Sequence, residues 1–248
     1  MIEINQLHCR YPDGTVAIKG LNLTIPDGEF LLICGPNGSG KTTLIRHING
    51  LLKPLSGIIR VDGRNVADSE DEVRKLVGMV FQDADSQIVG ETVREDVAFG
   101  PQNLGLAQVE IGERVEWALR KEELLELADK PCHLLSGGEK RRLAIAGVLA
   151  MQPHILIFDE PFANLDYSGV RQTLQQIVAF HQKGRTVIVT THDVEKVIAH
   201  VNRVAILYAG ELKSDGPPEA ILDDLSKYRI RPPCYSLFGA KPLSWLTA

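Results

Sequence analysis

Residues 30–51 read FLLICGPNGSGKTTLIRHINGL and decide the fold that we expect for this chain. The opening run FLLIC is short, apolar and suited to a buried strand, whereas TLIRHINGL is typical of a helix. Between them lies GPNGSGKT, at Gly35–Thr42, whose glycines let successive backbone N–H groups turn inward around phosphate oxygens. A loop of this kind at the start of a helix favours an anion, so the stretch predicts a phosphate-binding site.

The same loop predicts which groups contact a nucleotide and its metal ion. The ammonium of Lys41 can reach the β- and γ-phosphates, and the hydroxyl of Thr42 can coordinate Mg²⁺. We therefore expect ATP and Mg²⁺ as the bound cofactors. The residues of this stretch expected at the nucleotide are Gly35, Pro36, Asn37, Gly38, Ser39, Gly40, Lys41, Thr42 and Thr43.

A second motif, ILIFDEP at Ile155–Pro161, is an apolar strand that ends in two carboxylates. Asp159 would hold Mg²⁺ through its water shell, and Glu160 would accept a proton from the attacking water as general base. The alternative is that both acids are merely solvated at the end of a strand. We prefer the catalytic interpretation because the same chain supplies a phosphate loop that needs a metal ligand and a base.

Short apolar runs rich in β-branched residues recur between helical stretches and predict strands buried on both faces. They lie at Phe30–Cys34, Val77–Phe81, Ile155–Phe158, Val187–Thr190 and Val204–Tyr208. Three half-exposed runs near the N-terminus, IEINQLHCRY, LNLTI and GIIRVDG, are separated by PDG and DG turns and predict a small antiparallel sheet. The expected class is α/β, with a parallel sheet and an N-terminal antiparallel β-subdomain.

Strand runs disappear between about residues 89 and 149, where VEIGERVEWALRKEELLELADK shows helical spacing. We expect one domain over residues 1–225, with an inserted helical subdomain at about 85–150. The segment GELKSDGPPEAILDDL is expected to turn and then form a last helix. Residues 226–248 are expected to be a short C-terminal tail.

A third motif, LSGGE at Leu135–Glu139, precedes KRRLAIAGVLA, which has the small residues of a packed helix. A serine and two glycines at a helix start form an anion site, because unpaired N–H groups point outward there. An isolated SGG is more often an ordinary N-cap, and on these residues alone that alternative stays open.

In this order, GPNGSGKT, LSGGE and ILIFDEP resemble the ATPase family of ABC transporters, over nearly the whole chain. The resemblance implies a P-loop NTPase core of the RecA-like type with an inserted helical signature subdomain. It implies that ATP joins two ATPase chains head to tail, with the phosphate loop of one chain and the signature sequence of the other around each nucleotide. A homodimer and a heterodimer with a related chain both remain possible.

The resemblance also implies roles for residues outside the phosphate loop. Two of them join Glu160 in catalysis, namely Gln82 in the Q-loop, which also ligates Mg²⁺, and His192 as the switch histidine. The others would contact the nucleotide, namely Tyr11 by stacking on adenine, Asp166 in the D-loop, and Ser136, Gly137, Gly138 and Glu139 in the signature. Glu139 departs from the glutamine that is commonest in the family, which leaves the expected γ-phosphate contacts of the signature in place.

The region DADSQIVGETVREDVAFGPQNLGL, which follows Gln82, resembles the energy-coupling-factor and cobalt-transport ATPases. That resemblance implies uptake of cobalt or nickel ions or of a vitamin, with a transmembrane coupling subunit and a substrate-binding membrane subunit as partners. Asp85 and Gln87 would contact the cytoplasmic helices of the membrane partner, since an acceptor and an amide suit basic residues there. The alternative for these two residues is an ordinary solvated loop.

Composition excludes several other classes. The net charge is −5 and the chain has no lysine- or arginine-rich run, so nucleic acid is not an expected partner. No apolar stretch approaches the roughly 20 residues that cross a bilayer. We expect a peripheral protein at the cytoplasmic face of the cell membrane in a bacterium or archaeon.

The four cysteines are expected as free thiols, and His47, His154, His181 and His200 as ordinary core or surface histidines.

Other functions remain as alternatives. The chain could serve another kind of ABC importer, for example one for amino acids or metals. A soluble ABC ATPase of DNA repair would carry a long coiled coil between its motifs, and one associated with translation would carry two ATPase halves. Neither feature is present in this sequence, so a soluble ABC ATPase outside transport is the less favoured alternative. A module that only senses ATP would need a damaged second motif, whereas Glu160 and His192 are present. The transported substrate cannot be read from the sequence.

Overall fold

The structure is a computed structural model that describes residues 1–237, 239 and 242–246. It divides into two compact units. The first combines Met1–Arg74 with Ile157–Ala248, and the second is Lys75–Leu156. The second unit is thus an insertion in the chain of the first, and the helical subdomain expected at about 85–150 falls inside its bounds. Part of the expected tail, residues 238, 240–241 and 247–248, lies outside the described residues.

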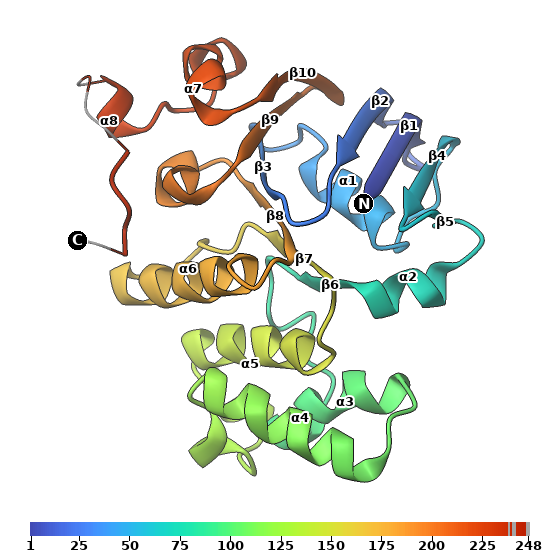
Figure 1. The fold of residues 1–248 in the computed structure, drawn as a ribbon, viewed down its shortest axis with the longest axis vertical. Helices are drawn as coiled ribbons and strands as arrows, with labels where there is room; N and C mark the ends of the chain where they lie inside the picture. Colours follow the sequence, from blue (N-terminus) through green and yellow to red (C-terminus); the bar gives the residue numbers. More distant parts are fainter. Residues whose placement is uncertain (238, 240–241, 247–248) are drawn as a thin grey trace. The chain divides into compact units, whose positions relative to one another are not determined.

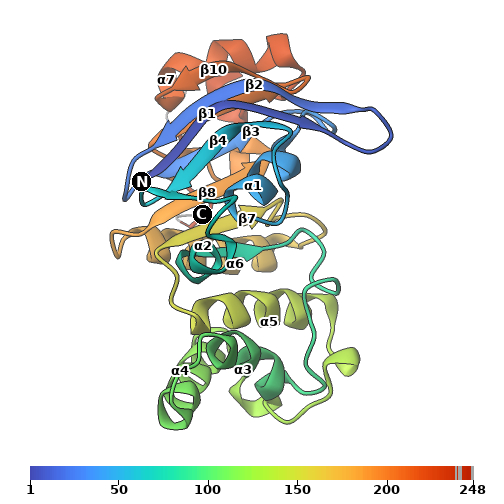
Figure 2. The ribbon, with the colours of Figure 1, turned by 90° about the vertical axis from the view of Figure 1, so that its right-hand side faces the viewer.

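The N-terminal strands form an antiparallel sheet. Its strands are β1 (Ile2–Arg10), β2 (Val16–Ile25), β4 (Ser56–Val61) and β5 (Arg64–Asn65), in the order β2-β1-β4-β5. Figure 2 shows β1, β2 and β4 side by side. Buried and exposed residues alternate along much of β1 and β2, which is the pattern of strands with one face on a core. The predicted antiparallel subdomain is therefore confirmed.

The second sheet carries the buried strands. Its order is β10-β9-β3-β8-β7-β6, and its strands are β3 (Phe30–Cys34), β6 (Val77–Val80), β7 (Ile155–Asp159), β8 (Thr186–Thr191), β9 (Arg203–Tyr208) and β10 (Glu211–Gly216). β3 pairs in parallel with both β8 and β9 (Figure 1). Every residue of β3, β7 and β8 is buried, as expected of strands covered on both faces. These strands confirm the predicted α/β class.

The first unit also contains helices and short 3₁₀ turns between and after its strands. They are α1 (Lys41–Ile48), α2 (Glu70–Leu76, which crosses into the second unit), α6 (Tyr167–His181), α7 (Pro218–Ile221) and α8 (Cys234–Leu237), with short 3₁₀ turns η3 (Val194–Lys196), η4 (Ile198–His200) and η5 (Leu222–Tyr228). α1 begins directly at the end of the glycine-rich loop, as the sequence predicts. No helix in the described part of the chain is long and apolar enough to span a membrane.

Two strands were absent from the sequence prediction, the two-residue β5 and the longer β10. The segment ELKSDG was expected to be a turn, but it forms β10 and pairs antiparallel with β9. It holds only one apolar residue, Leu212, so hydrophobic periodicity could not reveal it. Its pairing is reinforced by charge, because Arg203 on β9 donates to the carboxylate of Asp215 on β10 at 2.6 Å.

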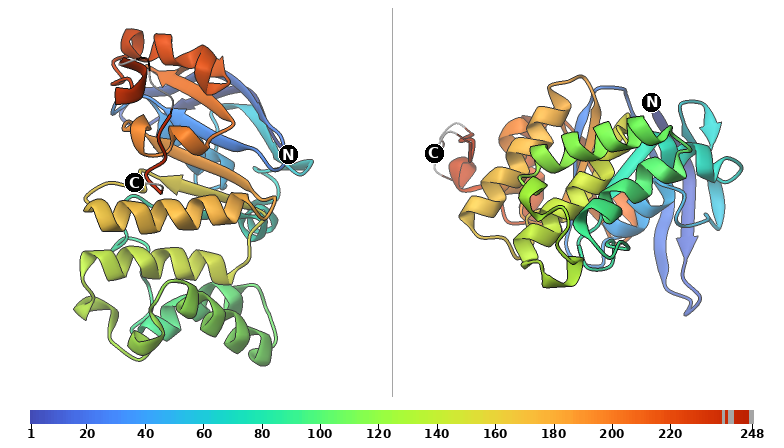
Figure 3. Two further views of the ribbon diagram at one scale, coloured as in Figure 1. Left: turned by 60° about the vertical axis from the view of Figure 1, so that its left-hand side comes forward. Right: turned by 90° about the horizontal axis from the view of Figure 1, so that it is seen from below.

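The second unit contains three complete helices in addition to β6. They are α3 (Val93–Asn103), α4 (Gln108–Lys121) and α5 (Gly137–Ala150), with 3₁₀ turns η1 (Leu125–Leu127) and η2 (Cys132–Leu134). Figure 3 shows the three helices close together, in green and yellow-green. Their shared core includes Val97, Leu119 and Leu143. α4 ends before the predicted helical pattern does, because Glu123 takes a left-handed conformation with φ of 56°.

A buried acid stands at the end of α4. Glu122 is 0% exposed, and neither of its carboxyl oxygens has a hydrogen-bond partner within the described chain. Burial raises the pKa of Glu122 to about 8, which the nearby Arg142 guanidinium opposes only in part. A buried carboxyl without partners favours its neutral form, because the charged form would lose its hydration.

Glu122 should make the stability of the protein depend on pH. Its folded pKa lies above the ordinary value of 4.5, so the proton it holds stabilises the folded state fully below pH 4.5, and that contribution disappears as pH rises through about 8. The isosteric change Glu122→Gln should therefore gain stability relative to the wild type as pH rises from 5 to 8, by up to about 4 kcal/mol. Urea denaturation across that range measures the difference.

An exposed acid of the same helix supplies the control. Glu113→Gln should shift the free energy of unfolding by a similar amount at every pH in that range, because Glu113 is exposed. A Glu122→Gln difference that does not change with pH would show that the Glu122 carboxyl is ordinary.

Candidate functional site

The glycine-rich loop is pressed closely against neighbouring backbone. A Cβ atom on Gly35 would lie 2.2 Å from the carbonyl oxygen of Leu207 and 2.6 Å from the hydroxyl of Ser39. Gly40 has a φ of 105°, and a Cβ atom there would meet the carbonyl oxygen of Ala17 at 2.7 Å. These glycines are required because no side chain fits between the loop and the strands beside it.

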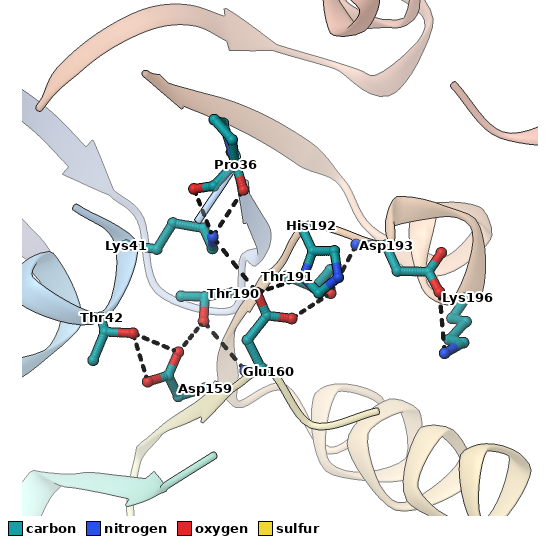
Figure 4. A network of polar contacts seen from close by, with 11 residues as sticks. Pro36, Lys41, Thr42, Asp159, Glu160, Thr190, Thr191, His192, Asp193 and Lys196 are labelled. Carbon is teal, nitrogen blue, oxygen red and sulfur yellow. Dashed lines mark hydrogen bonds and ion pairs between the residues drawn. The ribbon is translucent and has the colours of Figure 1, made fainter. Parts of the chain in front are cut away.

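A buried cation lies at the end of the loop. The ammonium of Lys41 donates to the carbonyl oxygens of Gly35 at 2.8 Å and Pro36 at 3.3 Å. It also forms an ion pair with Glu160, with 3.5 Å between Nζ and Oε1, and both side chains are more than 90% buried. Figure 4 shows this arrangement. A buried ammonium needs such partners, since an unpaired buried charge is strongly destabilising.

The next residue of α1 contacts the first acid of ILIFDEP. The hydroxyl of Thr42 donates to the carboxylate of Asp159, at 2.9 Å to Oδ2 and 3.2 Å to Oδ1. Asp159 also accepts from the hydroxyl of Thr190 at 2.6 Å (Figure 4). The two residues predicted as metal ligands from distant parts of the sequence are therefore within hydrogen-bond distance of each other.

Glu160 is held in a strained backbone conformation by β8. Its φ is 45°, a region that residues other than glycine rarely adopt, and its N–H donates to the carbonyl oxygen of Thr190 at 2.9 Å. Its Oε2 accepts from the hydroxyl of Thr191 at 2.9 Å, and its Oε1 lies 3.0 Å from Nδ1 of His192 (Figure 4). This geometry fixes the direction in which the carboxylate points.

Two further predicted residues of the first unit are placed by α1 and α6. The hydroxyl of Tyr11, just after β1, lies 2.7 Å from that of Thr43. Asp166 is the N-cap of α6, where its carboxylate accepts from the N–H of Gly169 at 2.8 Å. Asn37 and Gly38 lie on the exposed side of the loop.

The signature residues belong to the second unit. Ser136 is the N-cap of α5 and forms a capping box with Glu139, so the ordinary N-cap function is present. A Cβ atom on Gly137 or Gly138 would meet nothing within 4 Å, so the first turn of the helix is uncrowded. The N–H groups of that turn remain suited to an anion.

Gln82 and the segment after it also lie in the second unit. The guanidinium of Arg141, buried on α5, donates to the carbonyl oxygens of Phe81 at 2.6 Å and Gln82 at 2.8 Å. The side chain of Gln87 is turned inward. Its Oε1 accepts from the N–H of Phe81 at 2.9 Å, and its Nε2 donates to the carbonyl oxygen of Met79 at 3.3 Å.

Asp85 and Asp96 complete the surroundings of that segment. Asp85 is exposed and pairs with Lys140 on α5. Asp96 accepts from the N–H groups of Val89 at 2.7 Å and Gly90 at 3.0 Å, and burial raises the pKa of its carboxyl. Asp96 therefore fixes the far end of the segment, and Arg141 and Gln87 fix its beginning.

Several functional contacts were missed by sequence reasoning. Thr190 and Thr191 hold the two acids, and Arg141 holds the loop at Gln82. The two threonines stand at the end of β8, immediately before His192, so they could have been found as polar residues at the carboxyl end of a buried parallel strand. Arg141 offered no such signal, because KRR in a helix reads as an exposed charged face.

The residues present fit a nucleotide with a magnesium ion. The hydroxyl of Ser39 is buried and has no hydrogen-bond partner in the described part of the chain, so it can serve a phosphate oxygen. The space beside Gly35 excludes side chains, so the loop remains a backbone cradle. Thr42 and Asp159 offer hard oxygen ligands, and Mg²⁺ usually binds through one or two protein oxygens together with substrate phosphates.

Comparison with known proteins gives consistent matches. Residues 18–163 match the ABC transporter family. The energy-coupling factor transporter ATP-binding protein EcfA of Methanocaldococcus jannaschii is 43% identical over 232 residues, which cover 92% of this chain and 83% of that protein. The cobalt import ATP-binding protein CbiO of Rhodobacter capsulatus is 44% identical over 229 residues, which cover 90% of this chain and 82% of that protein.

Solved structures similar to this chain agree with the sequence matches. The cbiO1 protein of Clostridium perfringens, described as part of the ABC transporter complex cbiONQ, has a TM-score of 0.79 and 39% identity, with 93% of this chain and 94% of that chain covered. A dimeric ATP-binding cassette in a post-hydrolysis state with ADP and Pi has a TM-score of 0.80 and 30% identity, with 88% of this chain and 99% of that chain covered.

The two kinds of glycine in the loop should respond differently to a methyl group. Gly38→Ala adds only the strain of a φ of 77° in open space, and it should cost about 1 kcal/mol. Gly35→Ala should cost about 3 kcal/mol or more, because the added carbon meets backbone. Urea denaturation gives both values, and titration with a fluorescent ATP analogue should show lost binding for Gly35→Ala. Equal losses of stability would contradict the crowding described at Gly35.

Proposed function

This chain belongs to the ABC transporter family, and we propose that it is the ATP-hydrolysing subunit of an importer of the energy-coupling-factor type, for cobalt or nickel ions or a vitamin. The chain is an ATPase, and a dimeric relative has been captured with ADP and Pi. The observation that carries the proposal is the convergence of Lys41, Asp159 and Glu160 from the glycine-rich loop and β7. The proposal is supported by the chemistry of these three side chains, which suits phosphate, Mg²⁺ and water, and by the family match.

Phosphate binding is assigned to the loop and to Lys41. The N–H groups of residues 37–43 and the hydroxyl of Ser39 would surround the phosphates, and Lys41 would neutralise the β- and γ-phosphates. Thr42, Asp159 and Gln82 would hold Mg²⁺, which when bound neutralises charge that develops on the transferred phosphoryl group. Tyr11 would stack on the adenine, because it stands next to the helix that follows the loop.

Proton transfer is assigned to Glu160, with His192 and Gln82 orienting the attacking water. Phosphate oxygens compete with Glu160 for the ammonium of Lys41, because all are anions within reach of one buried cation. Nucleotide binding would therefore release Oε1 of Glu160 to accept a proton from water. The hydroxyl of Thr191 on Oε2 would keep the carboxylate in place meanwhile.

The signature residues would complete the site of a second ATPase chain. Ser136, Gly137, Gly138 and Glu139 begin α5, whose free N–H groups favour the γ-phosphate. Asp166, at the start of α6, would lie near the nucleotide of the partner chain. Hydrolysis would remove the phosphate that joins the two chains. A dimeric relative supports this assignment, and either a second copy or a related chain can be the partner.

The narrower transporter type rests on the relatives and on the segment after Gln82. Two relatives above 40% identity are named for energy-coupling-factor and cobalt import. The segment would contact a transmembrane coupling subunit that works with a substrate-binding membrane subunit. The protein would then lie peripherally at the cytoplasmic face of the cell membrane. Relatives in an archaeon and a bacterium leave both kinds of cell open.

Of the two residues expected to contact the membrane partner, Asp85 is the better placed. Its side chain is 68% exposed although it pairs with Lys140, so it can also accept from a basic residue of a partner helix. The amide of Gln87 is used inside the unit, so this residue would support the segment more than it would touch the partner. A contact between Gln87 and the membrane partner stays a prediction, and its amide already donates and accepts within the unit.

Replacing the proposed base should stop turnover while preserving ATP binding. Glu160→Gln should lower the ATPase rate on the order of 10²-fold or more and accumulate an ATP-bound dimer, because Mg²⁺ and phosphate contacts remain. Steady-state hydrolysis and light scattering with ATP measure both effects. The exposed acid on α7 provides the control Glu219→Gln, which should behave as the wild type. Wild-type turnover by Glu160→Gln would remove Glu160 as the base.

Reversing the charge of Asp85 should separate ATP hydrolysis from transport. Asp85→Lys should leave the ATPase rate of the isolated subunit within about twofold, because Asp85 is exposed, while it lowers co-purification with the membrane partner and uptake in cells. Glu113→Lys, an exposed reversal on α4 of the same unit, is the matched control and should retain both. Normal assembly and uptake with Asp85→Lys would show that Asp85 is not the contact.

A further inference from the structure

Three successive side chains at the start of α1 contact two different parts of the first unit, the end of β7 and the end of β1. Lys41 contacts Glu160, Thr42 contacts Asp159, and the hydroxyl of Thr43 lies 2.7 Å from that of Tyr11. The last of these contacts joins α1 to the end of β1 in the antiparallel sheet. The position of the Tyr11 ring therefore depends on how the first turn of α1 is rotated.

A buried histidine in the second turn of α1 forms a hydrogen bond to the first turn. His47 is 0% exposed, and its Nδ1 lies 2.7 Å from the carbonyl oxygen of Thr43. A carbonyl oxygen only accepts, so Nδ1 carries the proton and donates. The residue whose hydroxyl meets Tyr11 is thus the residue whose carbonyl is held by His47.

A small cavity lies beside the His47 ring, next to residues of the antiparallel sheet. Nε2 of His47 has no hydrogen-bond partner among the described residues, and the cavity beside the ring has a volume of about 10 Å³. Its lining includes Lys53, Ile59 of β4 and Asn65 of β5. This is room for a single water molecule, which can donate to Nε2.

The imidazole is neutral in this setting. Burial lowers the pKa of His47, and the carbonyls of Thr43 and Lys53, which favour a second proton, do not outweigh it. A neutral imidazole has a single N–H donor, and the short distance from Nδ1 to the carbonyl oxygen of Thr43 shows that this donor is Nδ1–H. His47 therefore braces α1 against β4 and β5 while directing its single proton to the turn that contacts Tyr11.

We propose that His47 is a positioning residue for the adenine site, which sets the place of the Tyr11 ring through the Nδ1–H bond to the Thr43 carbonyl and the Thr43 hydroxyl. This inference rests on the proposed adenine-stacking role of Tyr11. It differs from the expectation that His47 is an ordinary core histidine, because it links a buried side chain to nucleotide affinity. A core histidine would affect stability alone.

Amide side chains can separate the two ring nitrogens. Asparagine places its amide N–H near the position of Nδ1 and can still donate to Thr43, whereas glutamine reaches toward the position of Nε2 and the cavity. Leucine fills the space with neither donor. Stacking acts away from the reacting phosphate and so affects the ground state and the transition state alike. The affected quantity is therefore the KM for ATP.

The experiment measures KM and kcat for ATP hydrolysis, with thermal unfolding as the check on folding. His47→Leu and His47→Gln should each raise KM about fivefold with kcat nearly unchanged, and His47→Asn should stay within about twofold of the wild type. An unchanged KM in His47→Leu, or an equal rise in His47→Asn and His47→Leu, would overturn the inference.

Tyr11 variants separate this inference from the adenine-site proposal on which it rests. Tyr11→Ala should raise KM about fivefold with little change in kcat. If it does not, the adenine site lies elsewhere and the proposed role of Tyr11 fails first. In a Tyr11→Phe background, which lacks the hydroxyl, His47→Leu should raise KM by less than about twofold, because the connection is already broken. Independent, multiplying effects would show that His47 does not act through Tyr11.

Discussion

The buried ammonium of Lys41 is the constraint on which the rest of the structure depends. It has carbonyl oxygens of the loop on one side and Glu160 on the other, so β3, the loop and β7 must meet at one point. The parallel pairing of β3 with β8 brings Thr190 and Thr191 to the same edge, where they hold both acids. A chain that satisfies this one cation has already assembled the groups that would contact phosphate, metal and water.

Much of the fold and of the candidate site could be predicted because their signals are local. GPNGSGKT needs a strand before it and a helix after it, and both are present at the expected residues. Buried strands such as Ile155–Asp159 can be predicted from their nearly continuous apolar residues. β10 gave no such signal, since its pairing depends on Arg203 of another strand. The inward turn of Gln87 and the grip of Arg141 on Gln82 depend on packing between distant segments, which one sequence does not reveal.

Buried polar side chains in both units hold backbone groups in place near residues with proposed roles in binding. His47 in the first unit and Asp96 and Arg141 in the second each hold backbone groups beside a residue with a proposed role in binding. Glu122 differs, because its carboxyl has no hydrogen-bond partner in the described chain and is held neutral by burial. Satisfied buried groups specify geometry, whereas an unsatisfied one mainly reduces stability.

The central claim is that each ATPase site combines the phosphate loop of one chain with the signature of another. Complementation between two inactive variants tests it most directly. Lys41→Ala would disable the phosphate loop, and Ser136→Arg would block the signature, so neither protein should hydrolyse ATP alone. A 1:1 mixture should recover about a quarter of the wild-type rate, because half of the dimers are mixed and each keeps one intact site of two. A mixture as inactive as its components, or a Ser136→Arg protein that keeps full activity, would contradict the account.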